Sequence, residues 1–161
     1  MAELRWPPDI QPAAAPVYER RALRIAAPPD VVWRWLVRAA DWERWYAYCK
    51  RLRFDDGRGP DLAMGTRFTW STLGVTVTTT VTEFEPPHRL AWGGTGLGAR
   101  GYHGWLLDPV DGGCHVVTEE AQAGLLPSLL RVPIRRLLGM AHDRWLADLA
   151  TVATRGAPPA A

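Results

Sequence analysis

The sequence is poor in cysteine, and it has no long hydrophobic run. Its 161 residues include two cysteines, Cys49 and Cys114. Two are too few for a disulfide framework, so we expect free thiols in a cytoplasmic protein. No apolar stretch approaches the roughly 20 residues that cross a bilayer, and the N-terminus lacks the apolar region of a secretory signal. We therefore expect no integral membrane association.

The chain also has little net charge. Nineteen basic and seventeen acidic residues leave a formal charge of +2. Proteins dedicated to nucleic acids usually carry a basic face and excess positive charge, so no nucleic-acid partner is expected. Lys50 is the single lysine beside eighteen arginines, and we give this arginine excess no binding meaning.

Tryptophan is abundant instead, with nine residues in the chain. Each brings a large apolar ring system and one N–H group that needs an acceptor. The excess indicates either a bulky core or a cavity lined by aromatic side chains, and composition alone does not choose between them.

The length corresponds to one domain. Residues 1–16 are rich in proline and alanine and lack a clear period, so we predict an extended arm. Residues 17–154 form the predicted ligand-binding domain, and residues 155–161 a flexible tail.

Alternating apolar and polar residues predict seven strands, at residues 17–25, 48–54, 66–73, 75–84, 89–92, 100–107 and 114–121. Two short helices, 31–38 and 42–46, follow the first strand. A long helix over 133–153 has one apolar stripe, made of Ile134, Leu137, Ala141, Trp145, Leu149 and Val152. Short turns between the strands favour an antiparallel sheet with this helix on one face, an α+β fold.

The sequence gives no sound evidence for a dinucleotide site or a metal site. Residues 96–101 match G-x-G-x-x-G, but a strand follows them where dinucleotide binding needs a helix, so we interpret residues 93–98 as a mobile hairpin loop. The four histidines show no HxH or HExxH spacing. No metal and no cofactor are predicted.

Strand parity suggests a site. His103, Trp105 and Leu107 share one face of a strand, and His115, Val117 and Glu119 share a face of the next. If both faces look toward the long helix, the interior is aromatic with a few polar groups, as ligand sites often are. The alternative is that the tryptophans fill an ordinary core and Glu119 faces solvent beside Glu120.

Several segments together resemble a known superfamily. They are 27–33 (APPDVVW), 41–45 (DWERW), 81–92 (VTEFEPPHRLAW), 103–107 (HGWLL) and 119–120 (EE), with the terminal helix. The sequence resembles the START-related SRPBCC superfamily, and within it the bacterial polyketide cyclase/dehydrase-like proteins. The resemblance implies the helix-grip fold: a seven-stranded antiparallel sheet curved around a long C-terminal helix, with a deep cavity between them. It implies a hydrophobic ligand such as a polyketide, lipid or aromatic compound, but no single chemistry.

The leading hypothesis is a monomer or homodimer that binds a hydrophobic small molecule. If the protein is an enzyme, we expect cyclisation or dehydration without a cofactor. His103 would act as general base or acid, Glu119 would orient or protonate it, and Tyr46 would hold a substrate oxygen. The predicted lining residues are Trp70, Trp92, Trp105, Phe68, Thr72 and Val117. The alternatives are a non-catalytic carrier or sensor, and an interaction protein of the chaperone-activator or ribosome-associated type.

Overall fold

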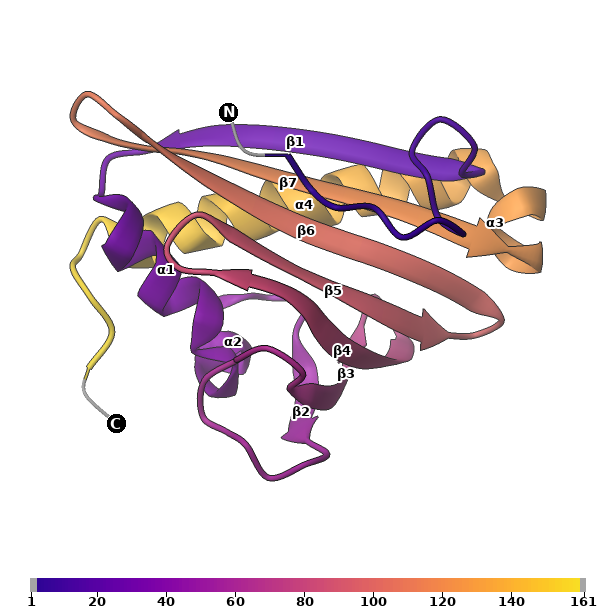
Figure 1. Ribbon diagram of the computed structural model, residues 1–161, viewed down its shortest axis with the longest axis horizontal. Helices are drawn as coiled ribbons and strands as arrows, with labels where there is room; N and C mark the ends of the chain where they lie inside the picture. The colour runs from indigo at the N-terminus through magenta and orange to yellow at the C-terminus, as the bar shows by residue number, and fades with distance from the viewer. Residues whose placement is uncertain (1–2, 160–161) are drawn as a thin grey trace.

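Seven strands form one curved antiparallel sheet in the computed structural model, in the order β1-β7-β6-β5-β4-β3-β2 (Figure 1). The structure describes residues 3–159; residues 1–2 and 160–161, the outermost positions of the predicted arm and tail, lie outside the described residues. The strands are β1 (Val17–Ile25), β2 (Lys50–Phe54), β3 (Arg67–Thr72), β4 (Val75–Glu85), β5 (Arg89–Gly96), β6 (Ala99–Val110) and β7 (Gly113–Gly124). The predicted fold class is confirmed.

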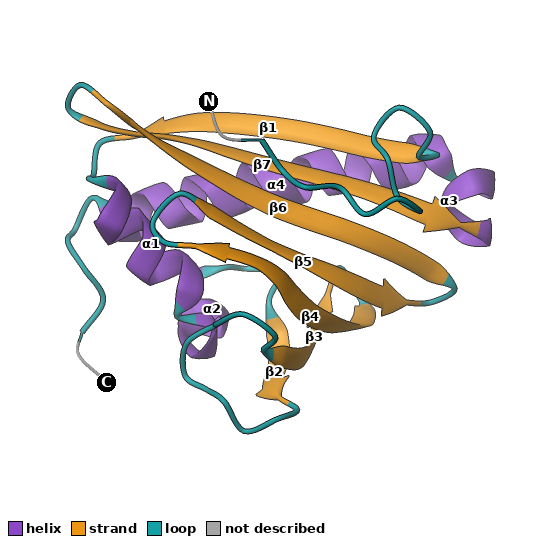
Figure 2. Ribbon diagram, in the orientation of Figure 1, coloured by secondary structure: helices purple, strands orange, loops and turns teal. Residues whose placement is uncertain are grey.

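The helices lie against one face and the two ends of this sheet (Figure 2). They are α1 (Pro29–Val37), the 3-10 turn η1 (Ala39–Asp41), α2 (Trp42–Trp45), α3 (Leu125–Leu129) and α4 (Arg131–Ala153). The centre of the predicted stripe on α4 is buried, at Ala141, Trp145 and Leu149. Helix α3 is not apparent in the sequence pattern, because it has only five residues and continues directly from β7.

The predicted hairpin loop at residues 93–98 is too long: β5 extends to Gly96 and β6 begins at Ala99. The turn consists of Leu97 and Gly98, both with positive φ angles. Glycine at position 96 allows the end of β5 to lie close to β4, because an added Cβ would stand 2.5 Å from the Thr76 carbonyl oxygen. A strand follows the glycines, so the helix that a dinucleotide motif requires is not there.

The main core fills the space between the sheet and the helices. Eight of the nine tryptophans lie in this core or pack against it. Trp42 is at its centre, fully buried, with ring centroids 5.1–5.9 Å from those of Trp145, Trp70 and Phe68. Most of the tryptophan excess is therefore structural, and Trp70, Trp92 and Trp145 also border a cavity.

A second apolar cluster lies on the opposite, outer face of the sheet, under the N-terminal arm. The arm crosses in front of β6 and β7 (Figure 1). Leu4 and Ile10 are buried there against strand residues, namely Ala91, Tyr102, Leu106, Val117 and Ala121. The arm therefore contributes apolar contacts to the fold as well as leading into it.

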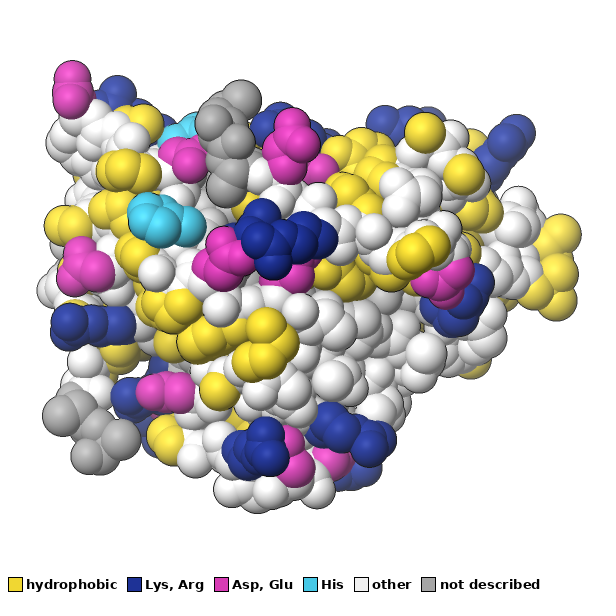
Figure 3. Space-filling view, viewed as in Figure 1, with side chains coloured by type: hydrophobic (Ala, Val, Ile, Leu, Met, Phe, Trp, Pro, Cys, Tyr) yellow, Lys and Arg dark blue, Asp and Glu magenta, His cyan; other side chains and the backbone are white. Residues whose placement is uncertain are grey.

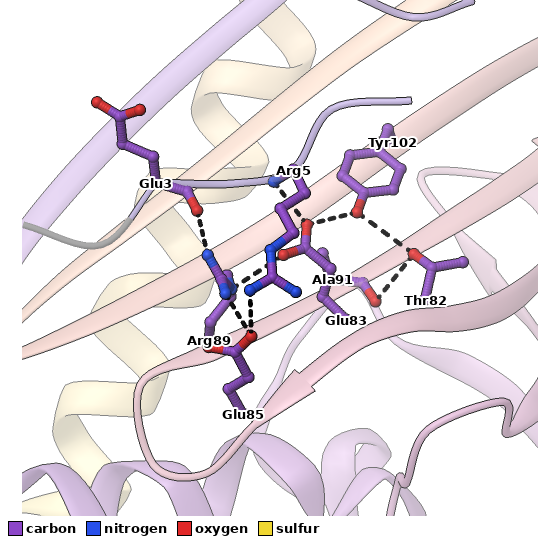
Figure 4. A network of polar contacts seen from close by, with 8 residues as sticks. All are labelled: Glu3, Arg5, Thr82, Glu83, Glu85, Arg89, Ala91 and Tyr102. Atoms are coloured by element: carbon purple, nitrogen blue, oxygen red, sulfur yellow. Dashed lines mark hydrogen bonds and ion pairs between the residues drawn. The ribbon is translucent and has the colours of Figure 1, made fainter. Parts of the chain in front are cut away.

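Polar contacts fasten the same arm to β4 and β5 (Figure 4). The backbone N–H of Arg5 donates to Glu83 Oε1 at 2.9 Å, and the Arg89 side chain donates to the Glu3 carbonyl oxygen. Glu83 and Arg89 are themselves a buried ion pair, with Oε2 and Nε 2.9 Å apart. At the other end of the chain, Trp35 donates to the Gly156 carbonyl oxygen at 2.7 Å, so the start of the tail lies along α1.

Charges of both signs are interspersed on the face that carries the arm (Figure 3). One example is the pair between Arg100 and Asp9, which joins β6 to the arm. Neither sign dominates this face, in keeping with the small net charge.

Gly104 provides a test of how the arm is held. A Cβ at this position would stand 2.4 Å from both methyl carbons of Leu4. Gly104→Ala is therefore expected to displace the arm and to speed amide hydrogen exchange over residues 3–10 by roughly 10- to 100-fold, since overpacking costs about 1–3 kcal/mol. Mass spectrometry of the exchanged peptides measures this rate. Gly93 is the matched control, because nothing lies within 4 Å of its Cβ position. Equal exchange in Gly93→Ala and Gly104→Ala would contradict the expectation.

Candidate functional site

A cavity of about 210 Å³ lies between the sheet and the first half of α4. Strands β3 to β7 form one wall, and α3 and α4 form the other. Most lining side chains are apolar, among them Trp70, Val75, Val77, Trp92, Leu126, Ile134, Leu138, Ala141 and Trp145. Leu97, in the turn between β5 and β6, also lines the cavity and is 68% exposed, so this turn lies where the cavity meets solvent.

Three ionisable side chains meet on the cavity wall. His103 comes from β6, Glu120 from β7 and His142 from α4. The antiparallel register places His103 directly opposite Glu120. His142 Nε2 donates to Glu120 Oε2 at 3.2 Å, and His103 Nδ1 lies 3.4 Å from the same oxygen. The two imidazole rings stack with centroids 4.8 Å apart. We call these three residues the His–Glu–His cluster.

Neighbouring polar groups fix the orientation of the cluster. His103 Nε2 lies 2.7 Å from Thr118 Oγ1, and Gln122 Nε2 donates to Glu120 Oε1 at 2.6 Å. His142 Nδ1 has no hydrogen-bond partner among the described residues, although the side chain is only 2% exposed. Buried polar atoms without a partner are rare in folded proteins.

Burial and neighbouring side chains set the charge states of His103 and Glu120. Burial lowers the pKa of His103 to about 3, against the attraction of Glu120, so this imidazole is neutral near pH 7. Burial alone would raise the pKa of Glu120, but the hydrogen bonds that its carboxylate accepts from His142 and Gln122 favour the ionised form, and its pKa lies below the usual range. A carboxylate and a neutral imidazole thus face each other in an apolar cavity.

The aromatic part of the wall is built around Trp145. Tyr46 stacks on it with ring centroids 4.1 Å apart and an interplanar angle of 14°. Burial raises the pKa of Tyr46, so its hydroxyl keeps its proton. The Nε1–H of Trp145 has no acceptor among the described residues. The wall therefore offers an aromatic surface.

Five of the residues selected from the sequence line the cavity: His103, Tyr46, Trp70, Trp92 and Thr72. Two others, Trp105 and Phe68, face the same side of the sheet but belong to the fully buried core. They support the wall and do not line the cavity.

The expectation that Glu119 and Val117 share the inner face with His103 is wrong. Residues directly opposite each other in an antiparallel pair lie on the same face of the sheet, and the residue opposite His103 is Glu120. Glu119 therefore points outward, where it accepts from the Tyr18 hydroxyl at 2.7 Å. Val117 packs in the outer cluster under the arm.

Sequence reasoning missed Glu120, Gln122 and His142. One signal for His142 was available, because residues 138, 142, 145 and 149 lie on one face of a helix. The sequence held no such signal for Glu120, because Glu119 and Glu120 are identical neighbours and the pattern does not show which of the two side chains points inward. The histidine spacing in the sequence also could not show this cluster, because its three members come from three separate elements.

The chemistry open to the cluster is proton transfer, hydrogen bonding to a polar ligand, or metal ligation. One donor atom from each of the three residues lies within 4.8 Å of the other two. Histidine and carboxylate are ordinary ligands of zinc-like ions.

In the described part of the chain, no helix is both long enough and apolar enough to span a membrane.

The comparisons with known proteins agree with this architecture. A family model described as polyketide cyclase / dehydrase and lipid transport matches residues 20–154. A sequence search among curated proteins gave no match. Among solved structures, the hypothetical protein jhp0584 from Helicobacter pylori is 26% identical, with a TM-score of 0.87, and the alignment covers 95% of this chain and 97% of that one.

Two further structures share the fold at lower identity. TTHA0849 from Thermus thermophilus is 19% identical with a TM-score of 0.72, and the alignment covers 88% of this chain and 99% of that one. The di-domain ARO/CYC StfQ from the steffimycin biosynthetic pathway is 16% identical with a TM-score of 0.72, covering 86% of this chain and 51% of that one. At these identities the likeness concerns the fold alone.

Proposed function

The chain belongs to the polyketide cyclase / dehydrase and lipid transport family, and from this premise we propose that it binds a small aromatic, polyketide-like molecule in the cavity beneath α4. The observation that carries the proposal is the combination of apolar walls with one polar cluster. Ligand sites commonly have this composition, because the apolar area supplies affinity and a few polar groups fix orientation.

The size of the cavity narrows the ligand class. An engineered apolar cavity of about 150 Å³ accepts benzene, and drug-sized ligands occupy roughly 300 Å³ or more. A cavity of about 210 Å³ suits one or two fused rings, or one end of a longer molecule whose remainder extends past Leu97. A ring would lie against the Tyr46 and Trp145 side of the wall.

The polar groups favour a ligand that carries oxygen. The unsatisfied N–H of Trp145 needs an acceptor, such as a carbonyl or phenolic oxygen. The Glu120 carboxylate accepts hydrogen bonds and would favour a phenol or enol hydroxyl. A hydroxylated aromatic satisfies both groups, whereas a plain hydrocarbon satisfies neither.

Isothermal titration calorimetry with 2-naphthol and naphthalene tests the proposal. At roughly 0.5–0.7 kcal/mol per non-hydrogen atom, within the range for small ligands, 2-naphthol should bind with a dissociation constant of about 1–100 µM. Naphthalene should bind at least about tenfold more weakly, because it leaves the polar groups unpaired. Equal affinity for the two would contradict the assigned polar contacts, and absence of binding by both would contradict the ligand class.

A second candidate function is catalysis of cyclisation or dehydration on such a ligand. The neutral imidazole of His103, within 3.4 Å of the Glu120 carboxylate on the cavity wall, favours it, as does the shared fold with the ARO/CYC StfQ. His103 would take up a proton from the carbon that attacks a carbonyl group, and the proton would leave with the departing water. Incubation with a linear poly-β-ketone tests this function. A product lighter by one water, absent with His103→Gln, supports it; unchanged ligand supports a carrier or sensor.

A further inference from the structure

The His–Glu–His cluster brings two imidazole nitrogens to the same carboxylate oxygen. Glu120 Oε2 stands between two imidazole nitrogens, 3.2 Å from His142 Nε2 and 3.4 Å from His103 Nδ1. The longer separation exceeds the usual N–H···O range of about 2.7–3.2 Å. We propose that His103, Glu120 and His142 form a binding site for one divalent metal ion of the zinc class, with its open coordination position toward the cavity.

The distances fit such an ion. Zinc binds histidine nitrogen and carboxylate oxygen at about 2.0–2.2 Å, so two ligands of a tetrahedral ion stand about 3.3 Å apart. The two measured separations, 3.2 and 3.4 Å, lie on either side of this value. Both separations involve Glu120 Oε2. The donor atoms of all three residues fall within 4.8 Å of one another, so side-chain rotation must bring the two histidine nitrogens closer together to complete the site.

Hydrogen bonds hold two of the three proposed ligands in place, whereas His142 Nδ1 has no partner among the described residues. A ligating histidine usually donates its second ring N–H to a neighbouring oxygen, which turns the other nitrogen toward the metal. Thr118 Oγ1 occupies this position for His103 Nε2, leaving Nδ1 toward Glu120. Gln122 holds Glu120 Oε1 in the same way, leaving Oε2 between the histidines.

The donor set also limits the type of metal. Two imidazoles and one carboxylate suit zinc and its transition-metal neighbours, whereas calcium and magnesium require six or more oxygen ligands. Three protein ligands leave a fourth position for water or a ligand atom, as in catalytic rather than structural zinc sites. All three side chains line the cavity, so this position is open to a bound small molecule.

A metal ion and a proton would compete for the position between His142 Nε2 and Glu120 Oε2. The ion would replace the proton that His142 Nε2 shares with Glu120 Oε2, and metal-loaded His103 would no longer accept a proton. The bound ion would instead polarise a carbonyl or enol oxygen of the ligand as a Lewis acid. This use of the ion rests on the proposed function, but the metal site itself does not.

The test is titration of the full chain, stripped of metal by a chelator, with Zn²⁺ and Co²⁺ in the absence of any organic ligand. We expect one ion per chain and, with Co²⁺, the visible absorption bands of a four- or five-coordinate site. Loss of an outer-shell contact commonly costs 10- to 100-fold in metal affinity, so Glu120→Gln and His142→Gln should each cost at least about 100-fold. His115 lies half-buried on the outer face of β7, and His115→Ala is the matched control, expected to bind as the unchanged chain does.

The control guards against metal binding at other histidines. Equal Zn²⁺ affinity in His142→Gln and the unchanged chain, or loss of binding in His115→Ala, would overturn the proposal. Circular dichroism verifies that each variant is folded. Zinc K-edge absorption spectroscopy gives a readout that does not depend on variants, because the site predicts scattering from two imidazoles and light O/N ligands; fewer than two imidazoles would overturn it. Calorimetry with 2-naphthol on the metal-free chain separates the outcomes, since that binding tests the proposed function alone.

Discussion

Replacing Arg89 by alanine is expected to lower the free energy of unfolding by about 3–5 kcal/mol, the usual cost of leaving a buried charge without its partner. The affected partner is Glu83, whose side chain is 5% exposed and whose Oε2 lies 2.9 Å from Arg89 Nε. Urea unfolding followed by tryptophan fluorescence measures the change.

The effect is large because Glu83 joins three parts of the fold. Its Oε1 accepts from the Tyr102 hydroxyl at 2.6 Å and from the backbone N–H of Arg5 at 2.9 Å (Figure 4). The Arg89 side chain also reaches the carbonyl oxygen of Glu3. Without the guanidinium, the carboxylate stays buried beneath the arm with no counter-charge.

Arg5 provides the matched control. Its side chain also pairs with a glutamate, Glu85, at 2.8 Å, but it is 70% exposed. Exposed pairs contribute roughly 0–1 kcal/mol, so Arg5→Ala should change stability by less than about 1 kcal/mol. Arg89→Lys should fall between the two alanine variants, since lysine keeps the charge but loses the two-pronged geometry. Similar losses for Arg5→Ala and Arg89→Ala would refute the ranking.

The position of Glu83 in the buried ion pair could not be predicted from the alternating pattern of β4. The alternation of Val75, Val77, Thr79 and Val81 predicts the strand and its inner face, and Val75, Val77 and Thr79 do line the cavity. Continued alternation would also place Glu83 inward. A register shift between Val81 and Glu83 turns this carboxylate to the outer face instead. Nothing in the local pattern marks the shift.

The N-terminal arm also makes the direction of the β7 side chains hard to predict from the sequence. Alternating apolar and polar residues identify the two faces of a strand when one face is buried and the other is exposed to solvent. Here Val116 is buried in the main core and Val117 in the outer cluster, so both faces are apolar. The direction of Glu119 and Glu120 then depends on the pairing with β6, and pairing is not visible in a single strand. Long elements such as α4 could be predicted, because their period repeats over many residues.

The cavity predicts a second large effect, on ligand affinity. Ala141 lies on α4, is 3% exposed and lines the cavity. Ala141→Phe would place a phenyl ring in a space of about 210 Å³, and a benzene molecule alone occupies an engineered cavity of about 150 Å³. Little room would remain for a two-ring ligand, so the affinity for 2-naphthol should fall at least about 100-fold, or roughly 2.7 kcal/mol. Calorimetric titration of the variant measures the loss.

Met140 is the neighbouring position that separates occlusion from a general effect of a larger side chain. It is 49% exposed on the same helix, so Met140→Phe should bind 2-naphthol as the unchanged chain does. Overpacking at Ala141 would cost about 1–3 kcal/mol of stability, and the unfolding transition must therefore be recorded beside the titration. If Ala141→Phe is folded and still binds 2-naphthol fully, the ligand lies elsewhere. If it is folded and does not bind, the space beneath α4 is the binding site, and the His–Glu–His cluster on its wall is in position to act on the bound molecule.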